Sequence, residues 1–420
     1  MHPATIVAGG AFVWAVKNYA ESKKRNPRGL PLPPGPRGLP VLGNMFQLPQ
    51  SEQWKAYEEL SKQYGDIVYL EAMGQPILIL GALDRTEDMM EKHATIYSDR
   101  PTLPIGQFMD MSTSFAFMGY GPEWRHDRRV FHQYLNHNAV SQYYPIMEEE
   151  ALNLLRKLSA DTRRVPRPYS ITTYGFDDVE ANKRLVEDAA YLVQSFAETI
   201  VPGRYLFNSF PSLGKLPDWV PGTGFKDRMR ELANLNNEVL TKPFISAKES
   251  MTVSSSWALV FAMAAYPEVQ KKAQAEIDLV IGNDRLPTLS DRESLPYVAA
   301  IVKEVSRWHS VVPLGLSRAS SEDSEYNGYF IPKGTIIMMN TWCGNSCTTP
   351  KSSTNQWSFI PERYLKDGKL NPKMRDPESA AFGYGTLSND AIFLMAASML
   401  AVFDIAPPKD EGRQPRGDGV

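Results

Sequence analysis

Apolar residues at helical spacing run through most of the chain after residue 86, and this periodicity constrains the fold more than any other feature. The stretch from Pro267 to Gly282 shows it clearly, because a proline opens it, a glycine closes it and its apolar residues recur on one face. A second stretch ends at His309 and pairs Ser290 with Glu293 as a capping box before an apolar stripe. This pattern predicts a mainly helical protein.

Two shorter stretches have the composition of β-strands instead. The first, from Asp66 to Leu80, reads as a hairpin in which a turn at Gly74 and Gln75 separates two β-rich runs. Residues 326–342 return to strand composition around a Pro-Lys-Gly turn. With 43% hydrophobic and 22% charged residues, the 420-residue chain has enough apolar side chains for a sizeable core. We therefore expect one large domain that is mainly α with small peripheral β-sheets.

The N-terminal region has a different composition. An apolar run from Ala4 to Val16 is followed by a cluster of basic residues that ends at Arg28. The run is shorter than the about 20 residues that span a bilayer, so it predicts a signal-anchor, a trimmed anchor or a helix lying in the interface. A helix packed on its own domain is the alternative. Because basic residues follow the run, we expect membrane association with the domain on the cytoplasmic side.

These changes in composition divide the chain into four parts. Residues 1–28 are the membrane anchor with its basic flank, and residues 29–50 are a Pro- and Gly-rich hinge that acts as a stiff spacer. Residues 51–408 are the folded domain and residues 409–420 a polar tail. The net charge of −3, without long runs of one sign, argues against a nucleic-acid partner. Only two cysteines are present, Cys343 and Cys347, which indicates a reducing compartment.

Glu304 and Arg307 lie three residues apart on an expected helix and can therefore form an ion pair. Taken alone, such a pair is most often solvated and contributes little to stability. The segment from Phe359 to Pro372 changes this interpretation, because Arg363 lies in a Pro-Glu-Arg-aromatic turn that can bring a second guanidinium onto Glu304. A carboxylate held between two guanidinium groups predicts a rigid buried lock.

Trp124 and Arg128 lie four residues apart in the segment from Tyr120 to Phe131, and hence on one face of a helix. An indole N–H beside a guanidinium is suited to hold an anionic group such as a carboxylate. The alternative interpretation is a cation–π pair at the surface.

Taken in order, these stretches resemble the cytochrome P450 family of haem-thiolate monooxygenases, in particular its fungal membrane-anchored members. The resemblance covers most of the chain and rests on the apolar anchor, PPGPRGLPVLGN, WRHDRR, YPEVQKKAQAEID, Glu304-x-x-Arg307, PERY and FGYG. Each motif alone is weak, whereas the set in this order is highly specific. By this resemblance, Glu304, Arg307 and Arg363 would form the structural triad that braces the haem-binding face.

The resemblance also implies a fold, a cofactor and partners. The fold would be that of a cytochrome P450, internally truncated in this chain. The cofactor would be haem, with its propionates held by Trp124, Arg128 and Arg318. An active member of the family would take electrons from an NADPH-cytochrome reductase and insert one oxygen atom into a small apolar substrate. Its place would be the endoplasmic reticulum membrane, on the cytoplasmic face.

The chain departs from the family at the cofactor. In the family, the loop that corresponds to Phe382, Gly383, Tyr384 and Gly385 leads to a cysteine whose thiolate is the axial ligand of the haem iron. Here residues 386–390 are Thr-Leu-Ser-Asn-Asp, and the sequence then resumes as the family's next helix. The ligand segment is therefore missing rather than substituted, and we assign no metal ligand.

No other residue is expected to replace that cysteine. Cys343 and Cys347 precede the Pro-Glu-Arg turn, which is the wrong side of the turn for the ligand loop. Three histidines near the Trp-x-x-x-Arg segment are interpreted as ordinary surface or core residues: His126, His132 and His137.

A second departure lies in the long helix that crosses the haem in this family and carries an acid–alcohol pair for oxygen binding and proton relay. Here the residues from Lys248 to Met251 stand at that position, and Met251 offers no hydroxyl. Thr252 or Glu249 would have to take the role, and Thr252 is the candidate that we carry forward.

Three interpretations follow. In the first, the chain as written is a catalytically inactive member of the family. In the second, the gene encodes an active monooxygenase of small apolar molecules and this sequence reflects a mis-spliced or mis-predicted transcript. In the third, the chain is a non-catalytic, membrane-associated binding protein. The substrate cannot be read from the sequence.

Overall fold

The structure, a computed structural model, describes residues 24–49, 51–101, 118–160, 211–220, 223–241, 246–310, 312–342, 358–377 and 386–407, with a few positions between 188 and 207. The N-terminal apolar run, the two cysteines, the loop from Phe382 to Gly385 and the polar tail lie outside these residues. Within the described part of the chain, no helix is both long and apolar enough to cross a membrane.

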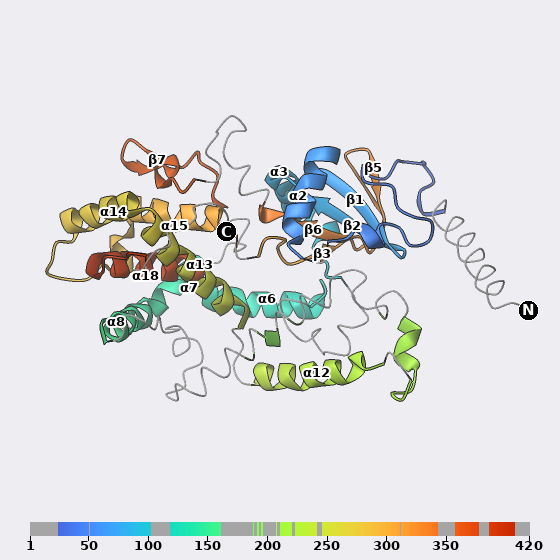
Figure 1. Ribbon diagram of the computed structural model, residues 1–420, viewed down its shortest axis with the longest axis horizontal. Helices are drawn as coiled ribbons and strands as arrows, with labels where there is room; N and C mark the ends of the chain where they lie inside the picture. The colour runs from blue at the N-terminus through green and yellow to red at the C-terminus, as the bar shows by residue number, and fades with distance from the viewer. Residues whose placement is uncertain are drawn as a thin grey trace, which may run out of the picture.

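Figure 1 shows two groups of elements side by side, one helical and one built on a sheet. The helical group contains α8 (Tyr144–Ala160), α13 (Ser246–Ala265), α14 (Pro267–Val280), α15 (Pro296–Trp308) and α18 (Thr386–Val402). The sheet group contains β1 (Ile67–Ala72), β2 (Gln75–Leu80), β6 (Ile336–Met339) and β3 (Arg318–Ala319), with α2 (Gln53–Tyr64) and α3 (Leu83–Glu87). Helix α12 (Phe225–Thr241) runs along the lower edge in this view, and α6 (Pro122–Leu135) lies above it.

Shorter elements connect these groups. They are η1 (Met45–Gln47), η2 (Asp88–Lys92), α4 (Ala94–Tyr97), α7 (His137–Val140), η4 (Ser141–Tyr143), η5 (Pro211–Lys215), η6 (Leu289–Ser294), β4 (Ser324–Tyr326), β5 (Tyr329–Ile331), η7 (Pro361–Tyr364), β7 (Leu365–Lys366) and β8 (Lys369–Leu370). The expectation of a mainly α protein with small β-sheets is confirmed.

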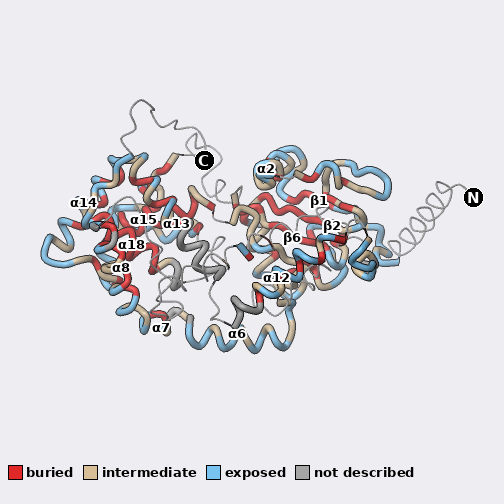
Figure 2. The backbone as a smooth tube through the Cα atoms, turned by 60° about the horizontal axis from the view of Figure 1, so that its bottom comes forward, coloured by how far each residue is buried: buried red, intermediate tan, exposed pale blue. Residues whose placement is uncertain are grey.

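Helix α18 is the centre of the helical group. Every residue from Ala391 to Leu400 is buried, as the red segment of Figure 2 shows. Helices α8, α13, α14 and α15 pack around it and share one apolar cluster with it. A helix that is apolar on all sides is stable in water only when neighbours cover all of it, which explains this arrangement.

The main sheet has the strand order β1-β2-β6-β3. Strands β1 and β2 are antiparallel, β2 and β6 are parallel, and β6 and β3 are antiparallel, with Arg318 opposite Ile337. Because side chains alternate between the two faces of a strand, the sheet has apolar residues on both sides. One face packs on Tyr57 of α2, and the other on Met89 and Tyr97.

The β1–β2 hairpin forms where the sequence predicts it, but its turn lies one residue earlier. The structure places the turn at Met73 and Gly74, with φ angles of +50° and +82°. Two successive residues with positive φ are typical of the turn whose twist matches that of a two-stranded ribbon. Gln75 is already the first residue of β2 and pairs with Ala72.

The capping box before α15 also differs from the prediction. Thr288, not Ser290, is the N-cap, and it exchanges hydrogen bonds with Asp291. The helix that begins there is the short η6, and α15 starts anew at Pro296. The Asp291 carboxylate that closes this box also pairs with Arg285.

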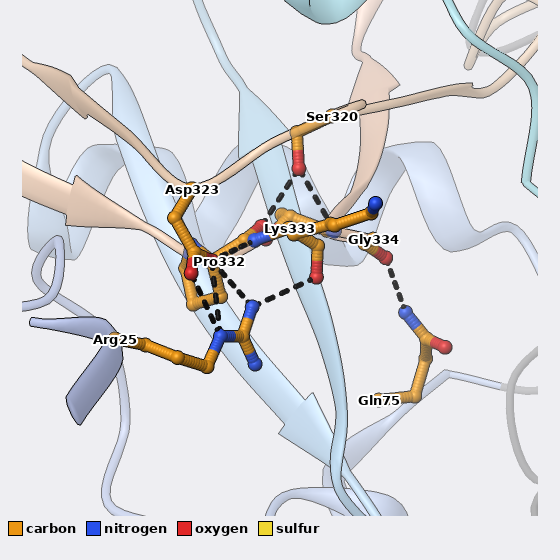
Figure 3. A network of polar contacts seen from close by, with 8 residues as sticks. Arg25, Gln75, Ser320, Asp323, Pro332, Lys333 and Gly334 are labelled. Carbon is orange, nitrogen blue, oxygen red and sulfur yellow. Dashed lines mark hydrogen bonds and ion pairs between the residues drawn. The ribbon is translucent and has the colours of Figure 1, made fainter. Parts of the chain in front are cut away.

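The Pro- and Gly-rich segment is attached to the sheet over much of its length. Tyr69 donates its N–H to the carbonyl of Pro34 at 2.8 Å, and Glu71 donates its N–H to the Asn44 side chain at 2.9 Å. Before it, Arg25 pairs with Asp323 in the loop before β4 (Figure 3). The part that the sequence predicts to be a spacer therefore adds to the edge of β1, because its free carbonyl groups can accept from an unpaired strand.

Candidate functional site

A pair of arginines forms the centre of the candidate site at the end of the sheet. Arg318 is the first residue of β3. Asp99 forms an isolated β-bridge with Ala319, in which the Ala319 N–H donates to the Asp99 carbonyl at 2.8 Å. This bridge brings Arg100, which follows Asp99 in sequence, beside Arg318.

Backbone carbonyls hold both guanidinium groups in place. The Arg100 Nη1 donates to the carbonyls of Leu316 and Ser317 at 3.1 and 2.9 Å. The Arg318 Nη1 donates to the carbonyl of Ser98 at 3.2 Å. Each arginine thus binds the strand or loop that carries the other, and neither contact neutralises the positive charge.

The charges in this cluster act against one another. The pKa of Arg100 is lowered to about 9, mainly by desolvation and also by the charge of Arg318, while Asp99 partly offsets both effects. Burial also lowers the pKa of Arg318, as does the charge of Arg128 on α6. Among the residues that the structure describes, the buried Nε of Arg100 has no hydrogen-bond partner. An anion between these guanidinium groups would relieve the repulsion and satisfy that donor.

Helix α6 brings Arg128 to this cluster and carries Trp124 one turn before it. The Asp99 carboxylate accepts the N–H of Tyr120 at 2.9 Å, which ties the start of α6 to the Arg100 loop. Trp124 is half-buried, with its ring centroid 5.2 Å from that of Tyr120. Arg128 is exposed on the same helix. On the same helix the Arg125 guanidinium lies over the Tyr120 ring, 5.7 Å from its centroid.

Two elements carry the three residues that are expected at an anion site. Helix α6 carries Trp124 and Arg128, and strand β3 carries Arg318. The Asp99–Tyr120 contact joins these two parts of the chain. Arg100 is a fourth member that the sequence reasoning missed. Nothing in the periodicity around Arg100 marks it, because its position depends on a β-bridge to a distant strand.

The second set of expected residues, Glu304, Arg307 and Arg363, meets inside the helical group. Arg307 binds Glu304 through two parallel hydrogen bonds, from Nε and Nη2, at 2.8 Å each. Arg363, in η7, donates its Nε to the same carboxylate at 3.1 Å. The Ile360 N–H donates to Glu304 as well, at 2.8 Å. The Glu304 side chain is 0% exposed, so this carboxylate is fully enclosed by donors.

The two guanidinium groups of this triad also share an acceptor. Arg307 and Arg363 both donate to the carbonyl of Ser358, at 3.1 and 3.2 Å. The triad thus joins α15 to the 3-10 turn η7 through one carboxylate and one carbonyl. Such a closed network fixes geometry and offers no free group for chemistry.

The start of α18 is held by a separate polar contact. Asp390 is buried, accepts a hydrogen bond from the Tyr144 hydroxyl at 3.1 Å, and pairs with Arg292. The Arg292 guanidinium also lies over the Phe393 ring, 5.3 Å from its centroid. Helix α18 begins at Thr386, so the chain has no length between Gly385 and this helix for a further loop.

These residues fit one part of a haem group and not the other. The arginine cluster, with an unpartnered buried donor, suits the two carboxylates of a haem. Iron needs an axial ligand, and residues 386–391 offer no thiol or imidazole. Among the described residues, no three His, Cys, Asp or Glu side chains are grouped as a metal site. His126 and His132 are exposed on α6.

The remaining candidates cannot be placed in the site. Thr252 lies within α13, but its side chain is outside the described residues, as are Cys343, Cys347 and the loop from Phe382 to Gly385.

Comparison with known proteins gives consistent matches over most of the chain. A model of the family "Cytochrome P450" matches residues 33–174 and 230–416. Cytochrome P450 monooxygenase COX1 of Coprinopsis cinerea is 45% identical, over 95% of this chain and 90% of that protein. Cytochrome P450 monooxygenase COX2 of the same fungus is 36% identical, over 99% and 89%. Cytochrome P450 monooxygenase 208 of Postia placenta is 34% identical, over 93% and 86%.

The length of the best of these alignments is informative. It extends over 466 positions, whereas 95% of this 420-residue chain is about 399 residues. The difference between these two numbers, about 67 positions, consists of gaps in this chain. The chain is therefore shorter inside the matched region than that relative, while its flanking segments still align.

Proposed function

This chain belongs to the cytochrome P450 family, and from that premise we propose that it lacks monooxygenase activity. In this proposal the chain keeps the fold and the carboxylate-binding face of the haem site, but it does not keep the iron ligand. Members of the family normally bind haem, typically use a reductase partner and act on small substrates. The observation that carries the proposal is the direct passage from Gly385 into helix α18, with Thr-Leu-Ser-Asn-Asp where an axial ligand is needed.

The arginine cluster supports retention of a binding face. Arg100 and Arg318 lie half-buried side by side, and their pKa values are lowered by desolvation and by neighbouring positive charge. Keeping two cations in such a place costs stability unless an anion joins them. A carboxylate-bearing ligand is the group that this face would take.

The closed triad supports retention of the fold. Glu304 is satisfied by Arg307, Arg363 and the Ile360 N–H, so the contact between α15 and η7 is complete without a cofactor. We therefore expect the helical group to fold whether or not haem is present.

The test is spectroscopic. The purified chain is incubated with haem, reduced and exposed to carbon monoxide, in parallel with COX1 of Coprinopsis cinerea as the matched positive control. We expect the control to give the Soret band of thiolate-ligated iron and this chain to lack it. A thiolate-type band from this chain would overturn the proposal, because it would require a sulfur ligand that we do not assign.

A second candidate function rests on the gapped alignment. Sequence on both sides of the gaps stays similar to COX1, as is expected if coding segments were omitted from an active gene. In that case the gene product is an active haem monooxygenase. Sequencing of transcripts across the codons for Gly385 to Ala391 and for Ser250 to Val253 distinguishes the two, since transcripts identical to this sequence exclude the active alternative.

We place the protein at the endoplasmic reticulum membrane, on its cytoplasmic face. The support is the apolar run from Ala4 to Val16 and the basic residues that follow it. A non-catalytic, membrane-associated binding protein is compatible with the same features.

A further inference from the structure

Two large aromatic side chains are exposed on the C-terminal half of helix α13. Trp257 is 53% exposed, and Phe261, one turn later on the same face, is 50% exposed. Residues 252–265 of this helix contain no charged side chain. An uncharged helix face that carries two exposed aromatic rings is typical of a surface that another segment covers.

Rings from neighbouring elements extend this face. The Phe261 ring stacks on the Trp308 ring of α15, with centroids 6.0 Å apart and planes inclined by 14°. Trp308 forms edge-to-face contacts with Tyr266 and Phe359, at 6.3 and 5.6 Å. Phe359 is buried in the apolar cluster of the helical group, so the core supports these rings from behind. We call Trp257, Phe261, Tyr266 and Trp308 the aromatic surface.

The segment that follows α18 is bound to α14 by two glutamines. The Gln274 Nε2 donates to the Phe403 carbonyl at 3.2 Å. One turn earlier on α14, Gln270 donates to the Ile405 carbonyl at 2.9 Å and accepts the Ile405 N–H at 2.8 Å. Because Gln270 precedes Gln274, the segment runs antiparallel to α14, toward the start of that helix.

The start of α14 is where the aromatic surface begins. Tyr266 is the N-cap of α14 and lies one turn before Gln270 on the same face. At 1.5 Å per residue, Trp257 lies at most about 20 Å from Gln270 along α13 and α14. Residues 406–412 span about 22 Å in the polyproline conformation. The chain that leaves Ile405 is therefore directed at the aromatic surface and is long enough to cross it.

The composition of this C-terminal segment suits an aromatic partner. After Ile405 the sequence continues as Ala-Pro-Pro-Lys, and a further proline stands at position 415. Proline fixes its own φ and keeps the residue before it extended, so Pro407 and Pro408 favour the polyproline conformation. Proline-rich segments bind to surfaces lined by aromatic side chains, because little conformational entropy is lost on docking. Arg413 adds a guanidinium of the kind that stacks on an indole ring.

We propose that residues 406–416 dock along the aromatic surface as an extended, proline-rich segment that covers Trp257 and Phe261. The surface is thereby a recognition site for proline-rich chain, and its occupant is the C-terminal segment of the same molecule. This inference is independent of the haem site and of membrane attachment, because none of its residues belongs to either.

The test uses the full chain with Cys343→Ser and Cys347→Ser and one introduced cysteine, G412C, that carries a bimane label. Contact with an indole quenches bimane fluorescence, so Trp257 reports whether the segment is docked. We expect Trp257→Phe to raise the emission about twofold or more, since the docked label loses the indole that it contacts. The control is Trp219→Phe, which removes an indole that is 82% exposed in the loop before α12 and should leave the emission unchanged.

A second variant changes only the docking segment. Replacing Pro407 and Pro408 by glycine makes this part of the chain flexible, and we expect the quenching at position 412 to fall by about half or more. A bimane label at L279C, on α14 where the native leucine is 87% exposed, should respond neither to this change nor to Trp257→Phe.

The dependence on protein concentration identifies the occupant. Quenching that is the same at low and high protein concentration supports docking within one molecule. Quenching that appears only as the concentration rises overturns the proposal in favour of a second copy of the chain on this surface. Emission that Trp257→Phe leaves unchanged, or that Trp219→Phe raises equally, also overturns it, because the segment then lies elsewhere.

Discussion

At the scale of single residues, two sets of charges differ in how completely they are matched. Glu304 is enclosed by Arg307, Arg363 and a backbone N–H, so its negative charge is fully compensated. Arg100 and Arg318 lie half-buried next to each other, and their positive charges repel. The first arrangement is complete in the folded chain, and the second would be completed by the anionic ligand that we propose. This contrast separates residues that hold the fold from residues that bind.

The first prediction concerns the matched set. Replacing Glu304 by Gln removes the charge that compensates two buried guanidinium groups. We expect a loss of about 3–5 kcal/mol in the free energy of unfolding, measured by urea denaturation at neutral pH. The control is Glu362→Gln in the neighbouring turn, whose side chain is 41% exposed and pairs with Lys272. That variant should lose about 1 kcal/mol or less. Equal losses in the two variants would contradict a buried lock.

The second prediction concerns the unmatched set. Arg318→Met and Arg100→Met each remove one guanidinium from the anion site. We expect each to weaken the binding of metal-free protoporphyrin IX about tenfold or more, since a hydrogen bond to a charged group contributes about 1.5–3 kcal/mol. Porphyrin fluorescence gives the affinity without any need for iron ligation. Arg125→Met, on α6 but stacked on Tyr120, is the control and should bind like the parent. A control that weakens binding as much as Arg318→Met would refute the assignment.

At the scale of elements, the sequence predicts the regular helices and the hairpin well. The helix from Pro267 and the β1–β2 hairpin form because proline, glycine and apolar spacing all favour the same structure. The errors have two sources. Thr288-x-x-Asp291 and Ser290-x-x-Glu293 are both local capping-box patterns, and the structure uses the first of them. The position of Arg100 depends instead on the β-bridge from Asp99 to a distant strand, which no local pattern encodes. The triad could therefore be anticipated from motifs, while the full arginine cluster could not.

The third prediction concerns the N-terminal clamp between segment 24–31 and the β4–β5 hairpin. The Arg25 guanidinium, followed by the Lys333 N–H, lowers the pKa of Asp323 below its usual value. A folded-state pKa below the unfolded value of about 3.9 stabilises the fold above that pH, and the gain is lost as the pH falls through the folded-state pKa. Because both side chains are partly exposed, the effect should be about 1 kcal/mol or less.

Asp323→Asn tests this directly. The parent should be more stable than Asp323→Asn in chemical denaturation at pH 6, and the difference should shrink progressively below pH about 4, where the parent carboxylate also becomes neutral. Glu322→Gln, which changes a neighbouring exposed carboxylate, is the control and should show no such pH-dependent difference. A difference between parent and Asp323→Asn that is constant from pH 6 to pH 3 would contradict the ion pair.

At the scale of the whole molecule, the two groups of elements are held by separate cores. The helical group has one apolar cluster around α18, and the sheet group has its own clusters on the two faces of the sheet. In the part of the chain that the structure describes, no apolar cluster is shared between the groups. A polar contact from Arg375 to Asp84 and Glu87 joins the segment after β8 to α3. Such a polar link couples two cores weakly.

The last prediction follows from this division. We expect calorimetry of the ligand-free chain to show two transitions, with a calorimetric enthalpy larger than the van't Hoff enthalpy. The reason is that the two cores share no apolar cluster among the described residues, and such cores unfold separately. The arginine cluster spans the division, since Arg318 belongs to the sheet and Arg128 to α6, which joins the helical group through α7. A porphyrin bound by both residues stabilises only the state in which both groups are folded. Adding metal-free protoporphyrin IX should therefore bring the two transitions together, whereas Arg318→Met should keep them apart. A single two-state transition without ligand would show that the groups are coupled by contacts other than those described.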